Sequence, residues 1–215
     1  MTGAREQILN RIRDALGRDT DEIDIAALRA RIARHPRHIE PAFDESPTQR
    51  LCAKLEAAAA SVARVDTLAE VGAAVENYLQ GNDLGRQLVC SGDALLQQIE
   101  WPPSLDLQRR VPLGADSVGI TSALCAIAET GTLMLISGQQ KPTSLNFLPD
   151  HHIVVLPLDQ LVMRMEDAWD RLREEGAGMP RSVNFISGPS KTADVEQTVE
   201  YGAHGPRCLH VILVG

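Results

Sequence analysis

Residues 117–137 read SVGITSALCAIAETGTLMLIS, a largely apolar stretch from which the fold class can be predicted. Its two apolar segments, 117–121 and 132–137, are short and rich in aliphatic side chains, which predicts two buried strands. The whole stretch is apolar enough to resemble a membrane span, but Glu129 lies inside it. An uncompensated carboxylate is costly at membrane depth. We therefore predict buried strands joined by a polar turn.

The same pattern of short apolar strands and amphipathic helices extends in both directions from this stretch. Ser46-Pro47-Thr48-Gln49 and Thr67-Leu68-Ala69-Glu70 have the form of capping boxes, and each predicts the start of a helix. Short apolar strands alternating with helices are typical of a largely parallel sheet covered by helices on both faces, so we predict an α/β fold for residues 46–215. Further helices are expected at 94–99 and 161–172, and the strands at 62–65, 87–90, 107–111, 117–121, 132–137, 153–156, 183–186 and 209–214.

Residues 1–45 differ in character from the rest of the chain. A helix is predicted over 5–16, where Gly17 supplies the stop, and a shorter one around 25–32. The segment between and after them is charged and is interrupted by Pro36 and Pro41. We predict an N-terminal helical arm that lies on the surface or on another subunit, where it serves either assembly or plain packing.

Composition limits the function classes. The 215 residues carry 21 Lys+Arg against 29 Asp+Glu, a formal charge of −8, and only 3% aromatic residues, which argues against nucleic acid and anionic membranes as partners. The first residues are charged and lack the apolar core of a secretory signal, so a cytoplasmic protein is expected.

The four cysteines predict reduced, buried thiols. They lie far apart, whereas iron–sulfur clusters and structural zinc need closely spaced thiolates. We therefore predict no metal site and no cluster in this chain; the cysteines are Cys52, Cys90, Cys125 and Cys208.

Ligands of parallel α/β sheets bind at the carboxyl ends of the strands, and three polar loops are candidates for that edge. The first loop contains Glu129, Thr130, Gly131 and Thr132. Burial among apolar strands would prepare Glu129 for acid–base or nucleophilic chemistry, so it is a predicted catalytic residue and the three that follow are predicted ligand contacts. The alternative is that Glu129 accepts hydrogen bonds that hold the turn.

The second loop, residues 186–196, is expected to lead from a strand into a helix. Its free amides and hydroxyls, together with the positive end of the helix dipole, suit a phosphate or a carboxylate. The alternative is that the acidic residues only complement the helix N-terminus. The predicted ligand contacts are Ser187, Gly188, Ser190, Lys191 and Asp194.

The third loop, residues 201–207, places His204 between glycines and ahead of Arg207. His204 is a titratable group and a predicted catalytic residue, and Arg207 is a predicted anion clamp. The alternative is a structural or solvated histidine.

Several motifs in order along the chain resemble the LUD domain of the lactate-utilization protein C family. The resemblance covers residues 46–215 well and the first 45 loosely; Lys191 stands where Arg is common, and Ala203 where Val is common. The motifs that carry it are Gly119-Ile120-Thr121, residues 127–132, Leu148-Pro149 with 152–155, residues 186–196 and residues 202–207.

The resemblance implies a fold related to the NagB/RpiA/CoA-transferase-like group and a part in the bacterial oxidation of L-lactate to pyruvate. It also implies iron–sulfur clusters on two partner proteins and no cofactor in this chain. Three hypotheses stay open: a subunit of a lactate-oxidizing complex that binds a small carboxylate, a stand-alone enzyme or sensor for a phosphorylated or CoA-type ligand, and a non-catalytic scaffold. The sequence leaves open whether the chain is itself catalytic and whether its copies form a homo-oligomer.

Overall fold

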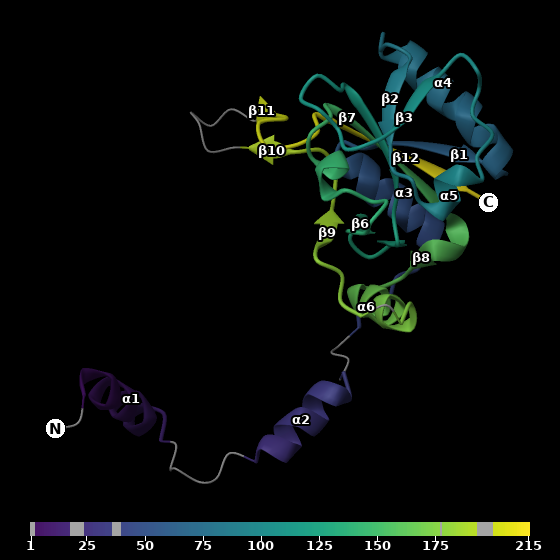
Figure 1. The fold of residues 1–215 in the computed structure, drawn as a ribbon. Coiled ribbons are helices and arrows are strands. Elements are labelled where there is room, and N and C mark those ends of the chain that lie inside the picture. The colour runs from purple at the N-terminus through teal and green to yellow at the C-terminus, as the bar shows by residue number, and fades with distance from the viewer. Residues whose placement is uncertain (1–2, 18–23, 36–39, 177, 193–199) are drawn as a thin grey trace. The chain divides into compact units, whose positions relative to one another are not determined.

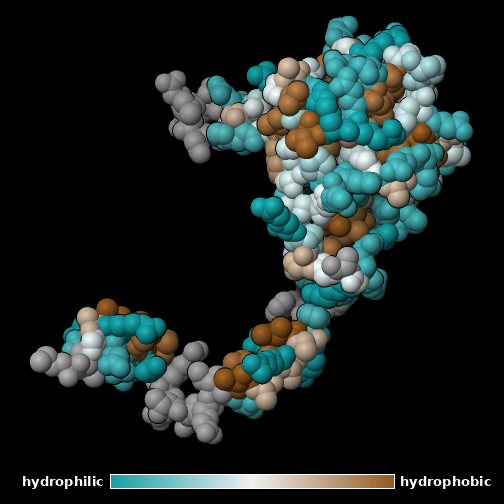
Figure 2. Space-filling view, in the orientation of Figure 1, coloured by the Kyte–Doolittle hydropathy of each residue, from teal (hydrophilic) through white to brown (hydrophobic). Residues whose placement is uncertain are grey.

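The computed structural model describes residues 3–17, 24–35, 40–176, 178–192 and 200–215. These residues belong to two compact units, 1–42 and 43–215. The first unit contains α1 (Ala4–Ala15) and α2 (Ile25–Ala33), close to the predicted bounds, and Gly17 follows α1 with the left-handed φ of 58° expected of a helix stop. Ile8, Ile12 and Leu16 lie on one face of α1 with about half of their surface exposed, and Figure 2 shows apolar groups at the surface of this helix.

The second unit is built on a six-stranded sheet that is parallel throughout (Figure 1). Its order is β1-β12-β7-β4-β2-β3, so the first strand pairs with the last. This confirms the predicted α/β class. The strands are β1 (Ser61–Val65), β2 (Gln87–Cys90), β3 (Asp106–Arg109), β4 (Val118–Ser122), β7 (His151–Pro157) and β12 (Cys208–Val214).

One face of this sheet is covered by two helices, the first of which follows the helix start predicted at 67–70; the second was predicted at 94–99 without a capping signal. A 3-10 turn, η1 (Leu68–Glu70), leads into α4 (Val71–Gly81), and Asp93 caps α5 (Ala94–Gln97). The side chains of α4 and α5 that face inward, such as Val75 and Leu96, are fully buried against Ile120 and Ile153 of the sheet.

The other face is covered by one helix together with a second sheet. Helix α3 (Pro47–Ala57) begins at the predicted capping box, in which Ser46 and Gln49 cap each other. Its Leu51 and Leu55 are fully buried against the second face of the main sheet. The second sheet has the order β8-β5-β6-β9, and α6 (Met165–Glu174) packs on its outer side; its strands are β5 (Cys125–Ile127), β6 (Thr132–Ile136), β8 (Leu161–Val162) and β9 (Val183–Ile186).

This second sheet corrects the sequence prediction. Segments 132–137 and 183–186 were expected in the parallel sheet, yet β6 pairs antiparallel with both β5 and β9. The reason is the short connection: the turn at Gly131, with φ 69°, reverses the chain directly, whereas a parallel pairing needs a crossover of a dozen residues or more. Leu161 and Val162 were expected to begin a helix, but they pair with β5 as a short strand.

Three further short elements connect these layers: η2 (Thr143–Asn146), η3 (Leu158–Gln160) and the β10–β11 hairpin, formed by Lys191–Thr192 and Glu200–Tyr201. Among the described residues, no helix has the length and apolar character needed to cross a bilayer.

We predict that Leu55→Ala lowers the free energy of unfolding by about 3 kcal/mol, because it removes a fully buried side chain between the main sheet and the second sheet. Urea unfolding followed by circular dichroism measures this. Glu56→Ala, one position along on the exposed face of α3, is the control and is expected to change stability by less than about 0.5 kcal/mol. Equal effects of the two substitutions would contradict the assigned role of α3.

Candidate functional site

The topology corrects the expected position of the three polar loops. The loop at 128–131 joins β5 to β6, and the loop at 187–190 follows β9, so both belong to the second sheet. The loop at 202–207 enters β12 at its first residue and therefore lies at the amino end of a main-sheet strand. None of the three marks the carboxyl edge of the parallel sheet, as we had expected from the strand pattern.

Two of these loops nevertheless meet around one cavity, of about 240 Å³. We call it the His152 pocket. Ser187, Gly188, Ser190 and His204 line it, so residues from the second and third predicted loops are brought together. The remaining lining residues are Asn146, Phe147, His152, Phe185, Ile186, Pro189, Gly205, Pro206 and Leu209.

His152 is the most unusual residue of this pocket. Its side chain is fully buried, and burial lowers the pKa of the imidazole to about 4, so the ring is neutral near pH 7. Nε2 lies 2.7 Å from the Thr121 hydroxyl, whereas Nδ1 is buried with no hydrogen-bond partner among the described residues. Buried polar atoms are normally paired, so an unpartnered Nδ1 in a residue that lines the pocket is an exception.

A chain of hydroxyls connects this pocket to the first predicted loop. Ser187 Oγ lies 2.6 Å from Thr132 Oγ1, which lies 2.7 Å from Thr130 Oγ1. Each hydroxyl both donates and accepts, so the chain can run in either direction. Thr132 is buried and Thr130 is exposed, and both reach the pocket only through Ser187.

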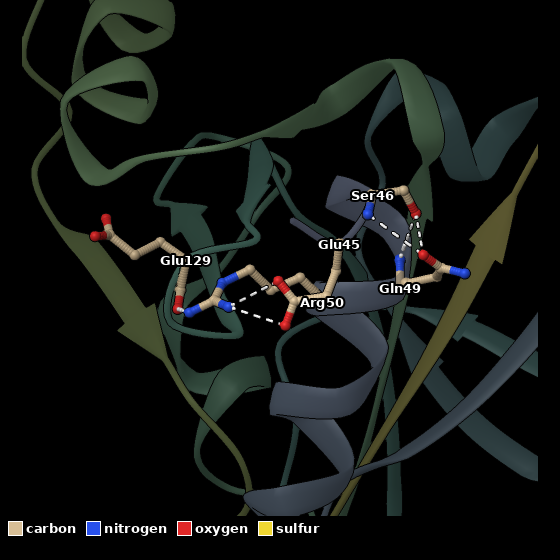
Figure 3. A network of polar contacts seen from close by, with 5 residues as sticks. All are labelled: Glu45, Ser46, Gln49, Arg50 and Glu129. Carbon is tan, nitrogen blue, oxygen red and sulfur yellow. Dashed lines mark hydrogen bonds and ion pairs between the residues drawn. The ribbon is translucent and has the colours of Figure 1, made fainter. Parts of the chain in front are cut away.

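Glu129 lies outside the pocket. Its backbone nitrogen donates to the Met163 carbonyl at 3.0 Å, and its backbone oxygen accepts from Arg50 at 3.4 Å. Figure 3 shows its side chain extending away from Arg50 and Glu45, and Oε1 lies 3.9 Å from Arg164 Nη1. With both backbone groups bonded and the carboxylate beside an arginine, Glu129 has the contacts expected of a residue that holds the turn.

The two predicted ligand-binding glycines pack against the end of α3. A Cβ at Gly131 would lie 2.5 Å from Lys54 Cβ, and one at Gly188, where φ is 90°, would overlap the Ala58 carbonyl. Both positions therefore require glycine for backbone packing and a left-handed φ.

The predicted cations do not line the pocket. Lys191 lies in β10 with Nζ 5.3 Å from the Tyr201 ring centroid, and Arg207 is exposed with Nε 3.6 Å from Asp150 Oδ1. Asp194, and the helix expected to contain it, lie outside the described residues.

Sequence reasoning gave too little weight to two polar residues of the pocket. His152 and Asn146 lie outside the three predicted loops. Both are buried; the signal available for His152 was a polar residue next to an apolar strand, whereas Asn146 lies in η2 and had no such signal.

The cysteines and possible metal ligands are dispersed. Cys52, Cys90, Cys125 and Cys208 are all free thiols. Over the part of the chain that the structure describes, no three His, Cys, Asp or Glu side chains converge on a position suited to a metal ion.

Comparison with known proteins shows what the chain is similar to. Residues 109–214 match the family described as the LUD domain. Lactate utilization protein C of Halalkalibacterium halodurans is 39% identical over 100 residues, which cover 45% of this chain and 44% of that protein. An uncharacterized protein of Neisseria meningitidis serogroup B is 34% identical over 122 residues, or 57% of this chain and 52% of that one. The match spans about half the length of these curated relatives.

A solved structure shares the fold. The crystal structure of a DUF162 family protein from Deinococcus radiodurans superposes with a TM-score of 0.60, covering 81% of this chain and 100% of that one. At 23% sequence identity this similarity concerns the fold alone.

The lowered histidine pKa values predict a loss of stability on acidification. Burial lowers the pKa of both His152 and His210 to about 4, against 6.5 for the free side chain. Between these values the unfolded chain binds protons that the folded protein does not, so stability falls as the pH drops from 6.5 towards 4. For each histidine, the free energy of unfolding is expected to fall by roughly 2 kcal/mol between pH 7 and pH 5.

Urea unfolding at the two pH values tests this. His152→Gln should reduce the pH-dependent loss of stability by roughly 2 kcal/mol, whatever its effect on stability at pH 7. The exposed His35→Gln serves as the control and should leave the loss unchanged. An unaltered pH dependence in the His152 variant would show that this imidazole is not held neutral by burial.

Proposed function

Since this chain carries the LUD domain over residues 109–214, we propose that it takes part in the utilization of L-lactate. The observation that carries the proposal is the similarity to proteins named lactate utilization protein C, at 34–43% identity. In more detail, the chain is a subunit of a system that oxidizes lactate to pyruvate. That reaction releases two electrons and two protons, so it needs a base and an electron acceptor.

Iron–sulfur partner proteins supply the acceptor in this proposal. The cysteines of this chain are far apart in the sequence and are free thiols, which supports placing the clusters on other subunits. The chain itself contributes binding and proton handling.

The His152 pocket is the proposed binding site for the small carboxylate. Its volume of about 240 Å³ suits a three-carbon acid, and polar groups from three separate segments converge there. His152 Nδ1 and Ser190 would bond the ligand, and His204 at the pocket rim would take the proton of the lactate hydroxyl. The catalytic role predicted for Glu129 stays a prediction, and this proposal does not rely on it, because the carboxylate lies outside the pocket. From its present position it would act only indirectly, through the neighbouring Thr130 hydroxyl and the chain to Ser187.

We predict that His204→Gln lowers lactate-dependent acceptor reduction by about 100-fold, as expected when a general base is removed. The measurement uses the complex co-purified from the native host. Glu129→Gln keeps the size and the backbone bonds of the turn and should retain most of the activity, because its carboxylate lies outside the pocket.

The exposed His35→Gln is the matched control for His204→Gln. Full activity of the His204 variant, or a full loss in the Glu129 variant with assembly intact, would contradict the assigned roles. Unimpaired growth on L-lactate of a strain lacking the gene would contradict the proposed function itself.

A non-catalytic docking role is a second candidate, favoured by the exposed apolar face of α1. Ile8 and Ile12 are 59% and 49% exposed on that face. We predict that Ile8→Gln combined with Ile12→Gln reduces co-purification of partner proteins, because exposed apolar faces of this kind commonly bind partners. Glu6→Gln with Arg13→Gln alters the opposite face of α1 without changing its net charge and should leave co-purification intact. Equal recovery of partners with both double variants would exclude α1 as a docking element.

A further inference from the structure

The order of the main sheet creates a topological switch point between β2 and β4. From β2 the chain moves outward to β3 at the sheet edge. It then returns to the opposite side of β2 to form β4, and continues away from β2 to β7 and β12. After β2 the chain therefore moves to one side of the main sheet, and after β4 it continues, by way of the second sheet, to the other side. Open α/β sheets bind ligands in the crevice at such a point, and none of the predicted site residues lies there.

A cleft of about 390 Å³ opens beside this position, at the carboxyl ends of β2 and β3, and we call it the switch-point cleft. It is larger than the His152 pocket and lies within the size range of small-molecule sites. The end of β2, the end of β3 and the loop after β6 all contribute to it, so the cleft joins residues before and within the LUD domain. Its lining residues are Cys90, Gly92, Gln97, Arg109, Arg110, Val111, Gln139, Gln140 and Pro142.

Arg109, which lines the cleft, and Lys141, in the adjoining loop, have no carboxylate partner among the described residues. Arg109, the last residue of β3, is exposed, and no described carboxylate lies within 4 Å of its guanidinium. Lys141 stands between the lining residues Gln140 and Pro142, and its ammonium donates to Ser122 Oγ at 2.9 Å rather than to a described acid. Arg110 differs, because Asp116 accepts from both of its terminal nitrogens, at 2.6 and 2.7 Å.

A buried network holds the ends of β2 and β4 together behind these cations. Asp93 is only 8% exposed and accepts from the hydroxyls of Ser91 at 2.6 Å and Ser122 at 2.9 Å. Its charge is thus satisfied inside the protein, while Ser122 in turn accepts from Lys141. The arrangement fixes Lys141 by a hydrogen bond and leaves the rim of the cleft positive, although the whole chain has a formal charge of −8.

We propose that the switch-point cleft binds a small organic anion, with its carboxylate or phosphate group at Arg109 and Lys141. Arginine and lysine are the side chains that proteins use for these groups. The exposed Val111 and the neighbouring Pro142 provide an apolar wall for the carbon skeleton, and the glutamines provide polar contacts. This site is separate from the His152 pocket and does not depend on the role in lactate utilization.

Titration calorimetry on the full chain tests the site with three probes at constant ionic strength: inorganic phosphate, pyruvate and 3-phosphoglycerate. We expect saturable binding of at least one probe. Arg109→Gln and Lys141→Met should each weaken it by about tenfold or more, because each removes a charged hydrogen-bond donor. Arg181→Gln and Lys54→Met remove the same charges from exposed positions elsewhere and should leave affinity unchanged.

The three probes also distinguish the source of the anionic group. Binding of the two phosphate compounds alone shows that the site requires a phosphate group, and equal binding of pyruvate shows that a carboxylate suffices. The proposal is overturned if no probe binds at millimolar concentration, or if Arg109→Gln, whose exposed side chain is not needed for folding, leaves affinity unchanged. It is also overturned if binding is lost in His152→Gln but kept in Arg109→Gln, because the ligand would then occupy the other pocket.

Discussion

The packing of α3 between the two sheets is the contact on which the other features of the fold depend. Leu51 and Leu55 fill the space between the main sheet and the second sheet, and neither residue has any exposed surface. The last turn of the helix approaches two loops so closely that only glycine fits, at Gly131 and Gly188. One of these glycines makes the turn beside Glu129, and the other shapes the floor of the His152 pocket. A single helix thereby sets the position of two loops that are more than fifty residues apart in the sequence.

Local signals in the sequence predicted the elements well but not the way they pair. The strand at 87–90 and the capping box at Ser46 are where the residue pattern placed them, because each depends on side chains only a few positions apart. The second sheet was missed because an apolar strand looks the same whether its neighbour runs parallel or antiparallel. One signal was available: the few residues between β5 and β6 are too short for a crossover helix.

The candidate site was predicted only in part, because local residue patterns do not determine how the strands pair. Ser187, Ser190 and His204 do meet around one cavity, yet this cavity lies at the amino end of β12 rather than at the carboxyl edge. Which edge of the sheet a loop occupies depends on strand direction and sheet order, and the residues of the loop determine neither. The importance of His152 follows from its complete burial beside Thr121. These two residues are 31 positions apart, so a pattern search over neighbouring residues does not detect their contact. The switch point likewise exists only once the strand order is known.

The position of β12 between β1 and β7 has a consequence for folding during synthesis. Ser61 and His210 are neighbours in the sheet although 149 residues separate them. Until β12 leaves the ribosome, β1 has no strand to pair with and β7 presents an unpaired edge to solvent. Pairing at this sequence separation carries a large loop-closure cost and is slow. Until then the nascent chain has unpaired backbone along β1 and along one edge of the apolar β7, and unpaired strand edges favour aggregation.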